Sequence, residues 1–309
     1  MDEHADANPD EESTRTVVVA VLVNVAIAAA KSIAALLTGS ASMAAEAAHS
    51  FADTGNEVLL FIGLRKSRKE PDARHPFGYG QERYFWAFLA ALGIFLIGGA
   101  LSIAEGVRSL LAPEPLESLW VGIGVLVVAA CLEAYSWRTA RRQLHADAAK
   151  RQRSIVEHLR RASDPSAPTV YLEDTAALIG LALAMVALIL HAWTGWAAWD
   201  AAGSICIGVL LLVVAVLLAR RSKALLLEES APPDVLDPIR ELVGRSWPGD
   251  VRDLQAVYVG PAQLLVNVWI APVSADGPAD ELIREVDALR AALLAVPAIT
   301  QATVTLTAR

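Results

Sequence analysis

The sequence predicts a membrane protein: an all-α bundle of six transmembrane helices, followed by a small C-terminal α+β domain. Of its 309 residues, 55% are hydrophobic and only 19% are charged, which is more apolar than an ordinary soluble domain. The charged residues are concentrated near the ends and in two central segments, so that apolar runs remain between them. Those runs are long enough to cross the roughly 30 Å of hydrocarbon in a bilayer.

Six apolar segments account for the bundle, which we assign to residues 15–222. The acidic residues 1–14 precede it, and they lack the basic start of a signal peptide. We expect them to form a disordered tail. The predicted spans are 15–38, 41–64, 83–111, 117–138, 168–193 and 197–220.

Alternate connections between these spans are basic. Lys and Arg are frequent in 65–83, 138–161 and 220–223, whereas the other three connections contain none. The positive-inside rule then predicts a multi-pass protein of the cell membrane with both termini in the cytoplasm. Four tryptophans fall near the opposite ends of the spans, where an aromatic belt is expected: Trp120, Trp193, Trp196 and Trp199.

Residues 230–309 follow a different pattern. A helical segment is followed by two alternating segments that meet at a Gly-Pro turn, then by an amphipathic helix and a last strand. The order α-β-β-α-β in about 80 residues is typical of a small ferredoxin-like α+β domain. We expect this domain to lie in the cytoplasm.

The second span carries an unusual row of polar residues in AAEAAHSFADTG. His49 and Asp53 are four residues apart and share one helix face, which Glu46 and Glu57 extend. A charge at the bilayer centre costs about 2.5–3.5 kcal/mol on insertion scales, so each one suggests a function. A hydrogen bond between helices is the alternative for His49, and capping near the span ends is the alternative for Glu46 and Glu57.

A second acidic pair, Glu173 and Asp174, lies near the start of the fifth span. Spans two and five run in opposite directions, so Asp53 and Asp174 can lie at one depth. Two carboxylates and the imidazole of His49 would supply three of the four ligands of a tetrahedral divalent metal ion.

Other polar residues of the spans have simpler explanations. Glu105 and Glu133 are helix-packing partners or part of a proton path, Asn24 and Lys31 are structural, and Asp200 caps the sixth span. The sequence shows no basic stripe, which argues against nucleic acid as a partner. The two cysteines lie in apolar runs and indicate neither a disulfide framework nor a Cys-rich metal site: Cys131 and Cys206.

Several ordered blocks resemble the cation diffusion facilitator family of divalent metal transporters. They are GSASMAAEAAHSFADTGNEVLLFIG, HPFGYGQERYFW, EDTAALIG and WDAAGSICIGVLLL. The resemblance covers residues 15–309 and includes the six-span layout with its small α+β domain. The Glu-Asp pair at the start of the fifth span is most similar to the zinc transporter 9 branch.

The resemblance implies a homodimer that exports a divalent metal, usually zinc, in exchange for protons. It implies a transport site of His49, Asp53 and Asp174, with a fourth ligand four residues before Asp174. That position is Val170, which cannot bind a metal. Either Glu173 or water supplies the fourth ligand, or the affinity and ion choice differ from the family pattern.

The resemblance also suggests a loop metal site at Asp72 and His75. The alternative is that HPFGYG forms a tight turn that fixes this loop. In many family members the C-terminal domain binds zinc through His and Asp. Here no His or Cys follows residue 206, so residues 230–309 are expected to act as a dimerisation module.

We therefore expect an alternating-access transporter in which protons compete with the metal for deprotonated ligands. A His ligand favours Zn²⁺, Co²⁺, Ni²⁺ or Fe²⁺ over Mg²⁺, and an oxygen-rich site also admits Mn²⁺. The metal is cargo, and no cofactor is expected. The alternative, which Val170 supports, is a transport-incompetent membrane metal sensor or dimeric scaffold. The motifs of an intramembrane enzyme are missing from the sequence, so we do not expect an enzyme.

Overall fold

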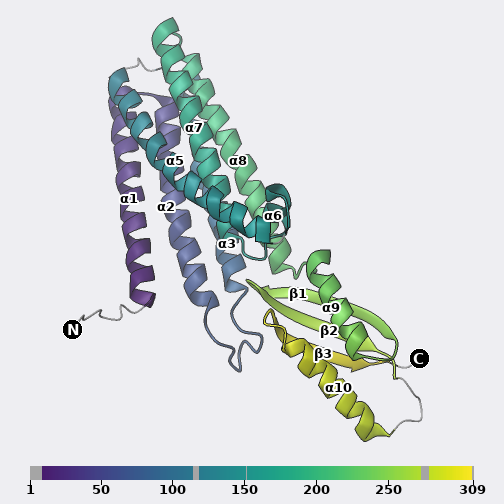
Figure 1. The fold of residues 1–309 in the computed structure, drawn as a ribbon. Coiled ribbons are helices and arrows are strands. Elements are labelled where there is room, and N and C mark those ends of the chain that lie inside the picture. The colour runs from purple at the N-terminus through teal and green to yellow at the C-terminus, as the bar shows by residue number, and fades with distance from the viewer. Residues whose placement is uncertain (1–8, 114–117, 151, 273–277, 308–309) are drawn as a thin grey trace, which may run out of the picture. The chain divides into compact units, whose positions relative to one another are not determined.

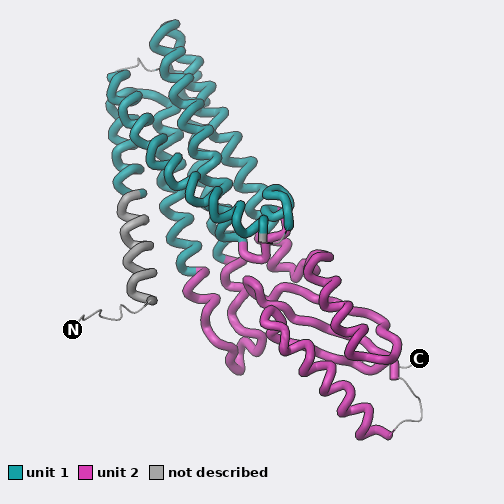
Figure 2. The backbone as a smooth tube through the Cα atoms, in the orientation of Figure 1, with its two compact units in different colours: residues 1–62, 86–159, 165–221 teal, residues 63–85, 160–164, 222–309 magenta. Residues whose placement is uncertain are grey.

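The computed structural model describes the backbone of residues 9–113, 118–150, 152–272 and 278–307, with side chains from Asn24 onward except at residues 95 and 150. The chain forms two compact units (Figure 2). The first comprises residues 1–62, 86–159 and 165–221, and the second comprises residues 63–85, 160–164 and 222–309.

The first unit is built of long helices (Figure 1). They are α1 (Pro9–Thr38), α2 (Ala41–Ser67), α3 (Glu82–Gly93), η1 (Ile94–Ala100), α4 (Leu101–Leu111), α5 (Leu119–Lys150), α7 (Ser166–Thr194) and α8 (Ala198–Leu226), with the short α6 (Ile155–Arg161) before α7. A helix thus covers each of the six predicted ranges, and the third range is interrupted by the π-helical turns of η1. Of the predicted N-terminal tail, residues 1–8 lie outside the described residues.

Within the described residues, four helical stretches are long and apolar enough to cross a membrane. They are Glu82–Leu111, Leu119–Ala149, Ser166–Thr194 and Ala198–Leu226. A shorter apolar stretch, Asn24–Thr38, covers the end of α1. Helix α2 is not in this group, because the polar residues predicted to bind the metal interrupt its apolar sequence.

The helices of the first unit pack closely through small residues. Helix α5 runs along α7 and also contacts α1. At Gly208 of α8, a Cβ atom would lie 2.8 Å from the backbone oxygen of Gly99 in η1, so no larger residue fits there. Alanine, methionine, leucine and isoleucine side chains fill the interior, including Met43, Leu126 and Ile207, which are at most 1% exposed.

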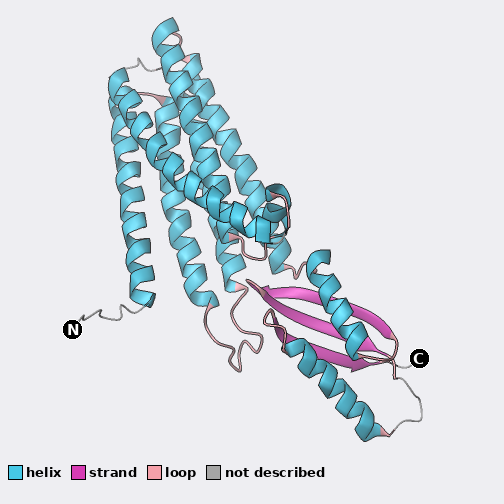
Figure 3. Ribbon diagram, viewed as in Figure 1, coloured by secondary structure: helices cyan, strands magenta, loops and turns pink. Residues whose placement is uncertain are grey.

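The second unit contains a three-stranded sheet in the order β1-β2-β3 (Figure 3). Strands β1 (Val251–Gly260) and β2 (Gln263–Ile270) are antiparallel, and β2 and β3 (Ile299–Leu306) are parallel. The helices α9 (Pro233–Ser246) and α10 (Ala279–Leu294) pack against each other and against the sheet. The predicted order of helices and strands after residue 230 is therefore present.

The connection between α2 and α3 belongs to the second unit, which the sequence did not indicate. Tyr84 is fully buried in the core of that unit. Gly80 lies against β1, where a Cβ atom would be 2.5 Å from the backbone oxygen of Val259. Gln301 Nε2 of β3 donates a 3.4 Å hydrogen bond to the oxygen of Pro76. Residues 63–85 are thus part of the α+β fold rather than a free loop.

Candidate metal transport site

Helix α2 changes character along its length. Most residues from Ala41 to Ser50 are buried, because small side chains allow the neighbouring helices to approach closely. Beyond Ser50, exposed and buried residues alternate, and Ser50, Asp53 and Glu57 share one face at helical spacing. This face looks into a cavity in the first unit.

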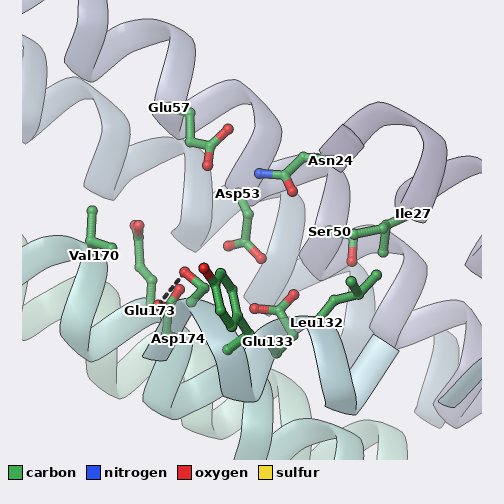
Figure 4. Close-up of a pocket in the computed structure, with 12 residues that line it drawn as sticks. Asn24, Ile27, Ser50, Asp53, Glu57, Leu132, Glu133, Val170, Glu173 and Asp174 are labelled. Atoms are coloured by element: carbon green, nitrogen blue, oxygen red, sulfur yellow. Dashed lines mark hydrogen bonds between the residues drawn. The ribbon is translucent and has the colours of Figure 1, made fainter. Parts of the chain in front are cut away.

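The cavity measures about 360 Å³ and lies among four helices (Figure 4). Each helix contributes at least two side chains to its wall, and nine of the twelve lining residues carry a polar group. The lining residues are Asn24 and Ile27 of α1, Ser50, Asp53 and Glu57 of α2, Leu132, Glu133, Tyr135 and Ser136 of α5, and Val170, Glu173 and Asp174 of α7.

Five of these lining residues are carboxylates, and none is a lysine or arginine. Such a concentration of acidic groups in a helical bundle produces a strongly negative potential, and it attracts cations. The five are Asp53, Glu57, Glu133, Glu173 and Asp174.

Two of the carboxylates are held by neighbouring side chains. Asp174 accepts a 2.8 Å hydrogen bond from Ser136 Oγ of α5. Glu173 accepts a hydrogen bond from Asn56 Nδ2 of α2 and is 8% exposed. Glu173 thereby connects α7 to α2 and still faces the cavity, although it lies about 100° around the helix from Asp174.

The predicted ligand His49 is present beside the cavity rather than in its wall. Its side chain is 1% exposed, and its Nδ1 lies 3.3 Å from Asp53 Oδ1. Neither ring nitrogen of His49 has a hydrogen-bond partner among the described residues, and the same holds for Asp53 Oδ1. A buried imidazole with two unsatisfied nitrogens is unusual, because burying an unpaired polar group is costly.

The described residues do not form a ready-made metal centre. No three His, Cys, Asp or Glu side chains in this part of the chain are close enough together to hold an ion. Asp53, Glu173 and Asp174 share the cavity wall, and Val170 also faces the cavity, where its side chain offers no ligand. The arrangement is an acidic cavity whose walls must draw together to coordinate an ion fully.

The other predicted pair, Asp72 and His75, lies in the second unit. The Asp72 carboxylate accepts hydrogen bonds from Lys69 Nζ at 2.9 Å and from the Tyr79 hydroxyl at 2.8 Å. It also accepts from the backbone N–H groups of Arg74 and His75, at 3.0 and 2.9 Å. His75 packs against Tyr79, with ring centroids 4.2 Å apart.

These contacts fix the charge of Asp72. The hydrogen bond from Lys69 is the largest of the effects that hold the pKa of Asp72 well below its usual range. The hydrogen bonds to Tyr79 and Asp72 in turn raise the pKa of Lys69. The geometry is that of a tight turn organised by one carboxylate, which is the alternative that the sequence left open for this segment.

Several residues that line the cavity were not predicted as metal ligands. Capping near the span end was the alternative for Glu57, and Glu133 was expected to be a packing or proton-path residue, but both line the cavity. Ser136 follows Glu133 by three residues, so its place on the same face of α5 was readable from spacing. Asn24 gave no such signal, because only the packing of α1 directs it into the cavity.

Asp200 also has a different role from the predicted one. Its carboxylate accepts hydrogen bonds from Ser40 Oγ at 2.7 Å, from the backbone N–H of Ala41 and Ser42, and from Ser42 Oγ. It therefore caps the start of α2 from α8, and it contributes to positioning the helix that carries Asp53.

Comparison with known proteins agrees with this architecture. A family model described as the cation efflux transmembrane domain matches residues 17–227. The human proton-coupled zinc antiporter SLC30A9, mitochondrial, is 35% identical over 229 residues, covering 74% of this chain and 40% of the human protein. Metal tolerance protein C4 of Arabidopsis thaliana is 32% identical over 253 residues, covering 82% of this chain and 55% of the plant protein.

A third relative is bacterial. The cation-efflux pump FieF of Escherichia fergusonii is 29% identical over 239 residues, which cover 74% of this chain and 71% of the pump. The chain spans less than two thirds of the length of the human and plant relatives. The matched family model nevertheless covers more than half of the chain, and the resemblance drawn from the sequence is confirmed. The chain belongs to the cation diffusion facilitator, or cation efflux, family, whose members are transporters rather than enzymes.

Proposed function

We propose that this protein exports a divalent metal cation, with zinc as the first choice, through the acidic cavity of its first unit. The observation that carries the proposal is the set of five carboxylates, without a lysine or arginine, around a cavity of about 360 Å³. The human relative is a zinc antiporter and the Escherichia fergusonii relative is a cation-efflux pump, which supports the export of a metal cation.

We infer that Asp53 and Asp174 are the principal ligands. They come from α2 and α7, so closure of these helices on the ion would bring both carboxylates to it. His49, next to Asp53, would join by a change of side-chain rotamer, and its unsatisfied nitrogens are suited to this. Glu173 takes the fourth position in place of Val170, since it already lies in the cavity wall.

Exchange for protons follows from the charge balance. One divalent ion cancels two of the five negative charges in the cavity wall, and uncompensated buried charge is costly. Protons on the remaining carboxylates would supply the difference, and protons would also displace the metal from its ligands. The name of the human relative, a proton-coupled antiporter, supports this coupling.

The topology proposed with this function has six membrane spans, with both termini on the cytoplasmic side of a cell membrane. The basic connections in the sequence support that orientation. The α+β unit is assigned as a ferredoxin-like dimerisation module of a homodimer. The loop formed by Asp72 and His75 is assigned a structural role, because its carboxylate already accepts four hydrogen bonds.

The second candidate function is a metal sensor or scaffold that binds an ion without moving it. Val170 at a cavity position where the family resemblance implies a ligand favours it. Zinc uptake into proteoliposomes with an imposed pH gradient separates the two functions. Uptake that follows the gradient supports the exporter, whereas zinc binding without uptake supports the sensor. Parallel assays with Mn²⁺, Co²⁺ and Fe²⁺ test the choice of ion.

A further inference from the structure

A fully buried ion pair of the first unit lies outside the cavity wall. Lys31 Nζ of α1 is 2.9 Å from Glu46 Oε2 of α2, and both side chains are 0% exposed. A complete ion pair inside a membrane bundle is costly to desolvate, so packing alone does not explain its presence.

Glu46 also contacts a third helix. Its second oxygen, Oε1, has no hydrogen-bond partner among the described residues and lies directly against Gly180 of α7. A side chain at position 180 would collide with this oxygen. The ion pair thus fills the space among α1, α2 and α7, three of the four helices that line the cavity.

The Lys31–Glu46 pair lies between the cavity and the end of the bundle at which α2 begins. Glu46 lies one turn before His49 on α2, on the side toward the start of that helix, whereas Ser50, Asp53 and Glu57 line the cavity on the other side. On α1, which precedes α2 with opposite direction, Asn24 lines the cavity and Lys31 lies about two turns nearer the connection to α2.

The end of the bundle at which α2 begins is tightly packed. Most residues from Ala41 to Ala47 are buried, and Asp200 holds Ser40, Ala41 and Ser42 by hydrogen bonds. Lys31 and Glu46 therefore lie between this closed end and the cavity.

Lys31 is also attracted by acidic groups of the cavity wall. It interacts electrostatically with Glu133 and Asp53 of the cavity as well as with Glu46. A lysine ammonium on its flexible stem can exchange one carboxylate for another. The Lys31 side chain therefore has two possible arrangements, one paired with Glu46 and one paired with a carboxylate of the cavity.

We propose that the Lys31–Glu46 ion pair is the closure of the transport pathway at the end of the bundle where α2 begins. The pair separates when the cavity opens to that side, and Lys31 then turns toward Asp53 and Glu133. This inference rests on the proposed transport function, but the two are tested separately: labelling reports whether the pair controls access to the cavity, and zinc uptake reports export. Lys31 and Glu46 act as positioning residues that seal the site without binding the ion.

The test measures access to the cavity directly. In a background of Cys131→Ala and Cys206→Ala, a single cysteine replaces Ser50, which lines the cavity and is 4% exposed. A membrane-impermeant cationic methanethiosulfonate reagent is added to right-side-out and to inside-out vesicles. A separate Trp196→Cys reporter identifies the face at which α2 begins, because Trp196 is exposed and lies four residues before Asp200, which caps α2.

With the native pair, we expect position 50 to be labelled from the face opposite to the Trp196→Cys reporter and at least tenfold more slowly from the reporter's own face. Lys31→Met and Glu46→Gln should each remove this difference. The exchanged pair, Lys31→Glu with Glu46→Lys, should restore it. The matched control is Arg108→Met with Glu105→Gln, which removes a partly exposed ion pair of α4 and should leave one-sided labelling intact.

Labelling that stays one-sided in both single variants would overturn the proposal. Equal labelling from both faces with the native pair, or no labelling from either face in any variant, would overturn it as well. The exchanged pair guards against variants that merely misfold, because it retains both charges. Zinc uptake is measured in parallel: one-sided labelling without uptake in the native pair would contradict the proposed export while the closure itself stands.

Discussion

The capping of α2 by Asp200 allows a quantitative prediction for Asp200→Ala. The carboxylate accepts hydrogen bonds from two backbone N–H groups and two hydroxyl groups at a buried helix start. Ser40 and Ser42 can still form a hydrogen bond with each other, since their hydroxyl oxygens are 3.1 Å apart. The two backbone N–H groups, in contrast, lose their acceptor. At about 1.5–3 kcal/mol for each hydrogen bond to a charged group, the substitution lowers the free energy of unfolding by roughly 3–6 kcal/mol.

Thermal unfolding of the detergent-solubilised protein, followed by tryptophan fluorescence, checks this value. A loss of 3 kcal/mol corresponds to a decrease in Tm of about 6–12 °C, at roughly 2–4 °C per kcal/mol. Asp200→Asn keeps one acceptor oxygen and should cost less. Asp250→Ala is the control, because this carboxylate forms an exposed ion pair with Arg252, and its loss is expected within about 0.5 kcal/mol. A Tm for Asp200→Ala equal to that of this control would refute the reasoning.

Two further predictions concern the second unit. Gly80→Ala places a Cβ atom 2.5 Å from the oxygen of Val259 and should destabilise that unit by about 1–3 kcal/mol. The control Gly244→Ala, where a Cβ atom would have nothing within 4 Å, should be neutral or stabilising. Equal Tm values for the two variants would contradict the close approach of Gly80 to β1. The pKa of Asp72 is lowered on folding, mainly by Lys69, so its contribution to stability is present above about pH 4, the unfolded pKa, and is lost as pH falls through the folded pKa. The stability difference between wild type and Asp72→Asn should therefore shrink as pH falls below about 4 in denaturant titrations, and a difference independent of pH would argue against the turn.

The helices and strands were largely predictable from the sequence because they follow from hydrophobic periodicity. The helices around Leu126 and Ile207 are long and apolar enough to cross a membrane, and β2 alternates buried and partly buried residues along its length. The row of polar residues on α2 that lines the cavity was equally predictable, since Asp53 and Glu57 are four residues apart, which is the helical spacing.

The contacts between distant segments were not predictable in the same way. Asp200 caps α2 across 159 residues, and Gly80 and Tyr84 join the α+β unit, although the intervening sequence gives no periodic signal for either. That His49 is buried beside the cavity, and not in its wall, was not predictable either, because spacing on one helix does not determine which neighbour covers each residue.

The passage of a divalent cation through the acidic cavity between α2 and α7 is directly testable. The most direct measurement is zinc uptake into proteoliposomes under an imposed pH gradient, comparing wild type with Asp53→Asn, Asp174→Asn and the control Glu105→Gln. We expect gradient-dependent uptake in wild type and in the control, and a loss of at least tenfold in each cavity variant. Uptake that survives both Asp53→Asn and Asp174→Asn would contradict it.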